Sequence, residues 1–200
     1  AGGVMGLIDL LKAPEYKDDE SLFHLLETNT RYLINEIEAH RDLVYAEKKI
    51  LGVHFVEINA MNFLNDIVDL AKYYPQISAE KSIAVEADNE NVNFRSDYIL
   101  AKRIILNMLK NALEATAKKG KIKAGFYEEE KNIVFWVQNE SVMTEEVRSQ
   151  VFQRSFSTKG HSRGIGTYSM RLFMENYLQG RVFFESTEQK GTIFYAVFPK

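Results

Sequence analysis

Asn107-Met-Leu-Lys-Asn111-Ala112 is the stretch on which the interpretation of the whole chain depends. On a helix, Asn107 and Asn111 lie one turn apart on the same face. The surrounding residues are apolar at helical spacing, which predicts a core-forming helix. A buried side-chain amide without a partner costs about 1–3 kcal/mol, so this pair needs a reason. Either the amides make a structural polar contact, or they bind a ligand with hard oxygen chemistry, such as a phosphate with its magnesium ion.

Composition excludes several classes of protein. The chain has 200 residues, of which 46% are hydrophobic and 26% charged, typical of a globular domain. The net charge of −3 provides no basic field, so we expect no contact with nucleic acid. Cysteine is absent, which excludes disulfides, thiolate zinc sites and a Cys nucleophile. No apolar run approaches the roughly 20 residues that span a bilayer, so we expect no membrane contact by this chain.

The N-terminal part, residues 1–52, is predicted to be a helical hairpin. Residues 4–12 have the pattern of an amphipathic helix, and residues 21–51 form a second, long helix without Pro or Gly. Gly52 is the expected C-cap of that helix. One hairpin cannot cover its own apolar stripe, so we expect a four-helix bundle formed with a second copy. The alternative is that the hairpin packs on its own downstream domain.

Residues 53–200 are predicted to form an α+β domain. The hydrophobic pattern predicts helices at 62–73, 95–117, 145–152 and 167–176, and strands at 82–87, 121–127, 132–138, 181–186 and 192–198. Layer logic then favours an α/β sandwich, with about five mostly antiparallel strands and helices on one face of the sheet.

The run from Ser155 to Thr167 contains few aliphatic residues but many hydroxyls, glycines and positive charges. Gly164 and Gly166 flank one residue just before a predicted helix start, where backbone N–H groups can approach an anion. Lys159 and Arg163 can add charge-assisted bonds to phosphate oxygens. A surface loop with a helix cap would have the same composition, and the run is not a P-loop.

The order of these elements resembles the ATP-binding domain of sensor histidine kinases, in the superfamily shared with DNA gyrase, MutL and related chaperones. The elements are an Asn-x3-Asn-Ala helix, a strand ending in a polar residue, a Phe-x3-Phe-Ser-Thr-Lys run, Gly-x-Gly, and Gly-Thr opening the last strand. The resemblance covers about residues 53–200, and the preceding hairpin resembles the kinases' dimerisation and phosphotransfer domain. It implies a Bergerat-type fold, ATP and Mg²⁺ as ligands, a homodimer, a response-regulator receiver domain as partner and a cytoplasmic location, whether the parent protein is soluble or membrane-attached.

The resemblance also implies roles for individual residues. Asn111 corresponds to the magnesium ligand, and Asn107 to the phosphate-side residue one turn earlier. The other nucleotide-binding positions are Asn139, Thr158, Lys159, Arg163, Gly164, Gly166, Gly191 and Thr192. Of these, Lys159 is expected near the terminal phosphates and Thr192 near the adenine. Phe152 and Phe156 correspond to aromatic residues that anchor a nucleotide lid.

The adenine end departs from the family pattern. The family has Asp-x-Gly-x-Gly after the central strand, with the carboxylate accepting a bond from the adenine amino group. This chain has Val137-Gln-Asn-Glu-Ser-Val-Met143 there, without the glycines. Asn139 is the best match counting from the strand, whereas counting back from Glu145 selects Gln138. An amide oxygen can accept the adenine bond, but without charge.

The phosphoacceptor is the second departure. The kinases carry a His followed by an acidic residue on the first hairpin helix, and the histidines of this chain lie elsewhere: His24, His40, His54 and His161. The chain does not begin with Met, and its first residues resemble the stretch that follows the acceptor His in one kinase subgroup. We therefore expect a fragment whose acceptor lies upstream, which binds nucleotide but does not label itself.

Two other functions compete with the kinase. A degenerate kinase acting as a dimeric signalling scaffold, with weak or no nucleotide binding, is suggested by the missing Asp-x-Gly-x-Gly element. An ATPase of the gyrase or MutL kind would use a Glu one turn before the metal-binding Asn to activate water. This chain has Asn107 at that position, and an amide is a poor base, which favours phosphoryl transfer over hydrolysis.

Overall fold

The computed structural model describes residues 2–12, 20–71, 81–117, 119–154 and 165–200. The chain divides into two compact units, Ala1–Leu51 and Gly52–Lys200. The first unit contains α1 (Gly2–Leu11) and the long helix α2 (Glu20–Glu47), which contact each other. The bundle across a dimer and the roles expected for the two units remain predictions.

Helix α2 ends earlier than the sequence predicted, at Glu47 rather than near residue 51. Lys49 adopts a left-handed conformation with φ of 59°, and the Ile50 N–H donates to the Tyr45 carbonyl at 3.0 Å. These are the features of a Schellman C-cap, with Lys49 in the position usually taken by glycine. The prediction that Gly52 caps this helix is therefore wrong, because Lys49 reverses the chain first.

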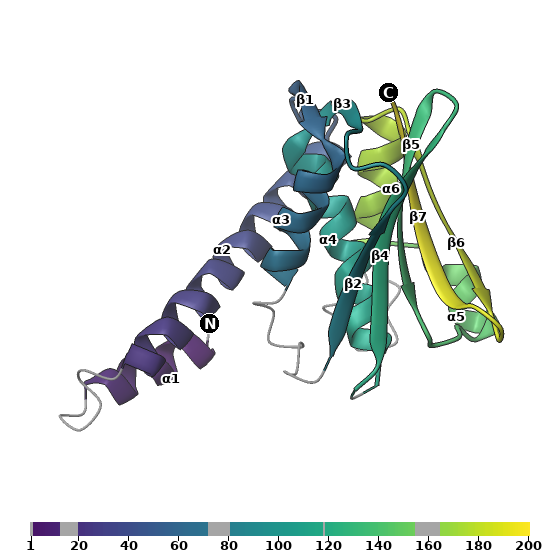
Figure 1. Ribbon diagram of the computed structural model, residues 1–200. Helices are drawn as coiled ribbons and strands as arrows, with labels where there is room; N and C mark the ends of the chain where they lie inside the picture. The colour runs from purple at the N-terminus through teal and green to yellow at the C-terminus, as the bar shows by residue number, and fades with distance from the viewer. Residues whose placement is uncertain (1, 13–19, 72–80, 118, 155–164) are drawn as a thin grey trace. The chain divides into compact units, whose positions relative to one another are not determined.

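The second unit is built on a five-stranded mixed sheet. Its strand order is β2-β4-β5-β7-β6, in which β2 and β4 are parallel and the other neighbours antiparallel. The strands are β2 (Ser82–Ala87), β4 (Lys121–Glu129), β5 (Asn132–Asn139), β6 (Arg181–Thr187) and β7 (Gly191–Pro199). Helices α3 (Ala60–Ala71), α4 (Tyr98–Ala115) and α6 (Gly166–Asn176) cover one face, and the short helix α5 (Glu145–Gln150) follows β5 (Figure 1). The predicted α+β class and mostly antiparallel sheet are confirmed.

Two short strands were not predicted. β1 (Phe55–Asn59) pairs antiparallel with β3 (Asn93–Asp97) in a separate two-stranded sheet. The helix predicted from residue 95 is therefore wrong over its first residues, and α4 begins at Tyr98. Local sequence could not reveal this, because the pairing of Arg95 with Glu57 is a long-range contact that overrides helical propensity.

The core is centred on the ring of Phe135 in β5. Its centroid lies 5.3 to 5.7 Å from the rings of Phe63, Phe94, Phe126 and Phe198. These rings come from α3, β3, β4 and β7, so one cluster joins the helical layer to three strands around β5. Helix α4, which carries the Asn107/Asn111 pair, contacts both α3 and β5 of this core.

Candidate functional site

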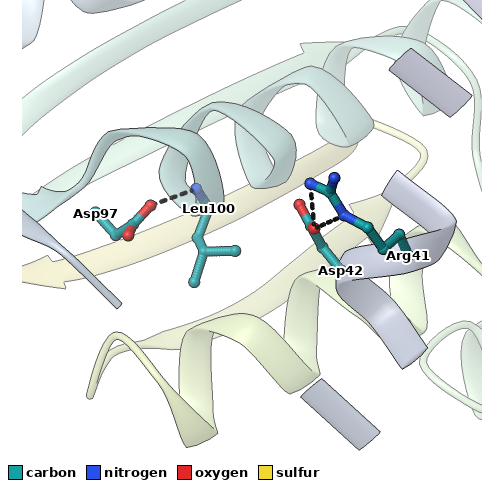
Figure 2. A network of polar contacts seen from close by, with 4 residues as sticks. All are labelled: Arg41, Asp42, Asp97 and Leu100. Carbon is teal, nitrogen blue, oxygen red and sulfur yellow. Dashed lines mark hydrogen bonds and ion pairs between the residues drawn. The ribbon is translucent and has the colours of Figure 1, made fainter. Parts of the chain in front are cut away.

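Asp97 determines where α4 begins. Its Oδ1 atom accepts a hydrogen bond from the Leu100 N–H at 3.0 Å, as an N-cap side chain does (Figure 2). Its other oxygen, Oδ2, accepts from the His54 N–H at 2.8 Å. Asp97 is 7% exposed, and its bond to Leu100 is buried whereas its bond to His54 is part-buried. Asp97 therefore sets the start of α4 and, with it, the direction in which the two amides point.

Three residues of α4 form what we call the polar stripe: Asn107, Asn111 and Ala115, the last through its carbonyl oxygen. They follow at four-residue steps and so share one side of the helix. Eight residues of helix span about 12 Å, which makes the stripe long and narrow. Helix α6 contacts one end of the stripe, and the segment after β5 contacts the other.

At one end, Asn107 contacts the first turn of α6. Its Nδ2 atom donates to Ser169 Oγ at 3.4 Å, and Ser169 Oγ donates to the Gly166 carbonyl at 2.8 Å. Helix α6 has no side-chain hydrogen bond at its N-cap residue, Ile165. Among the described residues, no side chain caps the positive end of the α6 dipole beside Asn107, an arrangement that suits an anion.

Asn111 lies in the middle of the stripe. Its Nδ2 atom is buried and has no hydrogen-bond partner among the described residues. Buried amide groups are normally paired, and an unpaired one destabilises the fold by about 1–3 kcal/mol. The unpaired atom is a donor and suits an acceptor such as a phosphate oxygen, whereas the amide oxygen is the atom that could ligate the cation expected at this residue.

At the other end of the stripe, the Ser141 hydroxyl donates to the Ala115 carbonyl at 2.6 Å. Ser141 also donates its backbone N–H to Asn139 Oδ1 at 2.9 Å. Its carbonyl accepts from Thr192 Oγ1 at 2.7 Å. Asn139 and Thr192 are direct neighbours in the pairing of β5 with β7. Ser141 therefore connects α4 to both residues expected near the base of a nucleotide.

The hydroxyls at this end form a directed chain. Thr192 gives its proton to the Ser141 carbonyl, so Ser186, 2.9 Å from Thr192 Oγ1, must donate to it. The Ser186 oxygen in turn accepts from the Met143 N–H at 2.9 Å. Thr192 and Ser186 are both buried. The donor of each bond is determined, so this end is rigidly specified.

The start of β7 beside Asn139 requires glycine at position 191. Its φ is 70°, in the left-handed region that favours glycine. A Cβ at this position would collide with the carbonyl oxygen of Asn139. The glycine thus lets β7 begin directly beside the last residue of β5, which brings Thr192 opposite Asn139.

The two alternatives for the adenine-facing residue lie on opposite faces of the sheet. Side chains alternate along a strand, so Gln138 and Asn139 point in opposite directions. Asn139 is 3% exposed, whereas Gln138 makes an exposed hydrogen bond from Nε2 to the Lys190 carbonyl. Asn139 is therefore the one of the two that shares a buried network with Thr192.

Part of the expected site lies outside the described residues: Thr158, Lys159, Arg163 and Gly164, together with the aromatic Phe156. The segment leading into this part is described. The Phe152 ring packs against Phe184 and Phe194 at 5.9 and 6.3 Å between centroids. The Arg171 guanidinium lies 5.9 Å from the Phe152 ring centroid. Phe152 thus anchors the chain to the sheet just before this part begins.

Serine residues were missed by sequence reasoning. Ser141 and Ser186 hold the Thr192 end, and Ser169 contacts Asn107, but none belongs to a periodic pattern. Ser141 could have been found from Asn139, because an Asn often forms an Asx-turn, in which its side chain accepts a hydrogen bond from the backbone N–H two residues later. Ser169 and Ser186 carried no such signal, since their partners come from other elements of the fold.

The described part of the site consists of amides, hydroxyls and backbone groups, which do not titrate near neutral pH. In the described ranges there is no cluster of three or more His, Cys, Asp or Glu residues that would hold a metal. A cation at Asn111 would therefore need further oxygens from a ligand such as a phosphate. Helices long and apolar enough to cross a membrane are also absent from the described part.

A family model matches residues 96–200, from β3 to the C-terminus, and is described as histidine kinase-, DNA gyrase B-, and HSP90-like ATPase. The chain belongs to this family. Within it, the chain is similar to sensor histidine kinases. The matched range includes the polar stripe and the residues that bond around Thr192, namely Asn139, Ser141 and Ser186.

Individual relatives agree with this assignment. The heme sensor protein HssS of Staphylococcus aureus is 24% identical over 175 residues, which cover 86% of this chain and 35% of HssS. The chain thus spans about a third of the length of this relative. The catalytic domain of histidine kinase ThkA is 27% identical, with a TM-score of 0.65 over 74% of this chain and 96% of that domain. ThkA in complex with the response regulator protein TrrA matches in fold over 98% of this chain and 56% of ThkA, at 24% identity and a TM-score of 0.67.

Proposed function

We propose that this chain is the ATP-binding catalytic portion of a two-component sensor histidine kinase. It would transfer the γ-phosphoryl group of ATP to a His on a dimerisation helix, from which a response regulator would receive it. The polar stripe of α4 carries this proposal. It connects a helix N-terminus that no described side chain caps, suited to phosphates, with a cluster of buried hydroxyl and amide groups suited to a base.

The residues divide the work along the nucleotide. Asn111 would hold Mg²⁺ through its amide oxygen, and the ion would neutralise charge on the phosphates. Gly164, Gly166 and the first turn of α6 would surround the phosphates, while Thr158, Lys159 and Arg163 would add donors and positive charge. Asn139 and Thr192 would contact the adenine beside Gly191. The chain contributes positioning and electrostatics rather than a covalent step of its own.

Hydrolysis is disfavoured by the residue one turn before Asn111. Asn107 has an amide, which does not take a proton from water near neutral pH. Its Nδ2 atom is also occupied by Ser169. The proposed chemistry is therefore phosphoryl transfer to an acceptor that needs little activation, the neutral imidazole of a His.

The helical unit would supply the dimer. Large apolar side chains of this unit are exposed within one chain: Met5, Leu10, Phe23, Leu25, Ile34 and Ile37. A second copy would bury them in a four-helix bundle. ThkA was crystallised with a response regulator, and we propose a receiver domain as partner for this chain also, in the cytoplasm.

Calorimetry and label transfer test the proposal together. We expect micromolar to millimolar binding of Mg-ATP, and about a hundredfold weaker binding by Asn111→Ala, which removes the proposed cation ligand. With γ-labelled ATP, label should appear on an added hairpin domain that carries an acceptor His, and not on the chain itself. Label on the isolated chain would contradict the expectation that it lacks an acceptor.

A degenerate kinase acting as a dimeric scaffold is the second candidate. The observation that favours it is the bond from the Ser141 N–H to Asn139 Oδ1, which engages the oxygen that adenine would need. Absence of detectable binding at millimolar Mg-ATP, in a chain that remains folded and dimeric, would favour the scaffold.

A further inference from the structure

The side-chain amide of Asn139 has a determined orientation. Its Oδ1 atom accepts a hydrogen bond from the backbone N–H of Ser141 at 2.9 Å. A backbone N–H can only donate, so the atom that faces it must be the amide oxygen. Because Ser141 belongs to the segment that follows β5, Oδ1 is directed toward that segment, and Nδ2 lies on the other side of the amide group. Nδ2 makes no hydrogen bond to a described residue.

The hydroxyl protons around Asn139 are already used. Thr192 Oγ1 donates to the Ser141 carbonyl at 2.7 Å, and the Ser141 hydroxyl donates to the Ala115 carbonyl at 2.6 Å. Ser186 donates to Thr192 Oγ1, since Thr192 has no second proton to give. Among the side chains of these described residues, the protons left for a ligand are therefore the two on Asn139 Nδ2.

Asn139 lies on the face of the sheet that the helices cover. It is on the same side of β5 as Phe135, whose ring packs against Phe63 of α3. Strand pairing places it opposite Thr192, at the end of the polar stripe to which the proposed function assigns the base of the nucleotide. Asn139 is 3% exposed, so a ligand group that faces Nδ2 must accept its protons or leave them unpaired.

Purine bases differ at position 6 in a way that such a donor distinguishes. Adenine carries an amino group there, which donates, whereas guanine carries an oxygen, which accepts. Nδ2 can donate to that oxygen, but two donors would meet if an amino group took its place. The aspartate of the family's Asp-x-Gly-x-Gly element is the reverse case, since an ionised carboxylate has no proton and can only accept.

We propose that Asn139 makes this site favour nucleoside triphosphates of 6-oxopurines, such as ITP and GTP, over ATP. This inference rests on the proposed nucleotide site and concerns the base that the site selects. Oδ1 retains a second lone pair beside the bond from Ser141, so ATP is still accepted, with lower affinity. The triphosphate is the same in these nucleotides, so the preference arises at the base.

Calorimetry of the unmodified chain with Mg-ITP and Mg-ATP measures the preference directly, because the two nucleotides differ only around position 6 of the base. We expect Mg-ITP to bind about tenfold more tightly, the effect of one hydrogen bond. Asn139→Asp removes the donor and should reverse the preference, so that Mg-ATP binds more tightly than Mg-ITP. Gln138→Glu makes the same exchange of amide for carboxylate on the opposite face of the sheet, and it should retain the preference for Mg-ITP.

Equal affinities in the unmodified chain, or tighter binding of Mg-ATP, overturn the inference and leave the proposed nucleotide site standing. An Asn139→Asp chain that still prefers Mg-ITP also overturns it, because the preference then has another origin. If the unmodified chain shows cooperative thermal unfolding but binds neither nucleotide at millimolar concentration, the proposed function fails and the inference fails with it.

Side-chain amide NMR tests the contact without any variant. The Nδ2 protons of Asn139 should shift downfield when Mg-ITP saturates the site, because they then donate to the oxygen of the base. Mg-ATP at saturation should shift them less. The same shift with both nucleotides, or no shift with Mg-ITP, contradicts a contact between Nδ2 and position 6.

Discussion

The two ends of the α4 polar stripe are built from the same residue types but differ in how completely their polar groups are hydrogen-bonded. At the Thr192 end, each hydroxyl has a partner and the direction of each bond is determined. Toward the α6 end, in the middle of the stripe, Asn111 Nδ2 is buried without a partner among the described residues, and the N-cap residue of α6, Ile165, makes no side-chain hydrogen bond. Saturated polar groups stabilise one geometry, whereas unsatisfied ones are costly unless a ligand completes them. The closed end, at Thr192, thus supports the fold, and we propose that the ligand binds toward the open end, at Asn111.

Replacing a polar group by an apolar one of similar shape should therefore have opposite effects at the two ends. Thr192→Val leaves the Ser141 carbonyl without its donor and Ser186 without its acceptor in a buried site. We expect a loss of about 2 kcal/mol in the free energy of unfolding, measured by urea denaturation. The control is Thr187→Val, whose exposed hydroxyl accepts a turn bond from the Lys190 N–H, with an expected loss below about 0.5 kcal/mol. Equal losses in both variants would mean that the buried hydrogen bonds of Thr192 contribute no more to stability than an exposed turn bond.

The second prediction concerns the Thr192 end and the effect of a negative charge at position 139 on nucleotide affinity. An amide oxygen already accepts the Ser141 N–H, and a carboxylate has more acceptor sites for a second donor. Asn139→Asp should therefore bind Mg-ATP roughly tenfold more tightly, as measured by calorimetry. Gln138→Glu adds the same charge on the opposite face and should leave affinity unchanged. If both variants gain affinity, long-range charge rather than contact is responsible.

Asn111→Leu tests the open end with the smallest expected effect on folding. Removal of an unpaired buried amide should raise the free energy of unfolding by about 1 kcal/mol while Mg-dependent nucleotide binding is lost. Asn107→Leu is the matched variant one turn away, and it should destabilise the fold because Ser169 loses a donor. A destabilised Asn111→Leu chain would show that Asn111 has a structural partner after all.

The elements that sequence predicted correctly were those with strong local periodicity. The strands of the five-stranded sheet and the helices α3, α4 and α6 were all anticipated, apart from their ends. β1 and β3 were not, because a strand such as Asn93–Asp97 alternates weakly and exists through its pairing with Phe55–Asn59. The early end of α2 was missed because Lys49 accepts a conformation usually left to glycine.

For the site, sequence supplied residue types but not their bonding. Asn107, Asn111 and Asn139 could be recognised as amides in family positions, and the choice between Gln138 and Asn139 remained open. Strand pairing places Asn139 opposite Thr192. Ser141 and Ser169 became visible only through contacts to Ala115 and Asn107 on another element.

Sequence by itself determined that a core-forming helix carries two amides one turn apart and that a glycine-containing run precedes another helix. It also determined family membership, since the order of these elements along the chain is a property of sequence. The tertiary structure alone decided which amides and hydroxyls are paired and which are left open. The reason is physical: a hydrogen bond depends on distance and on which atom carries the proton, and at this site both are set by residues far apart in the chain.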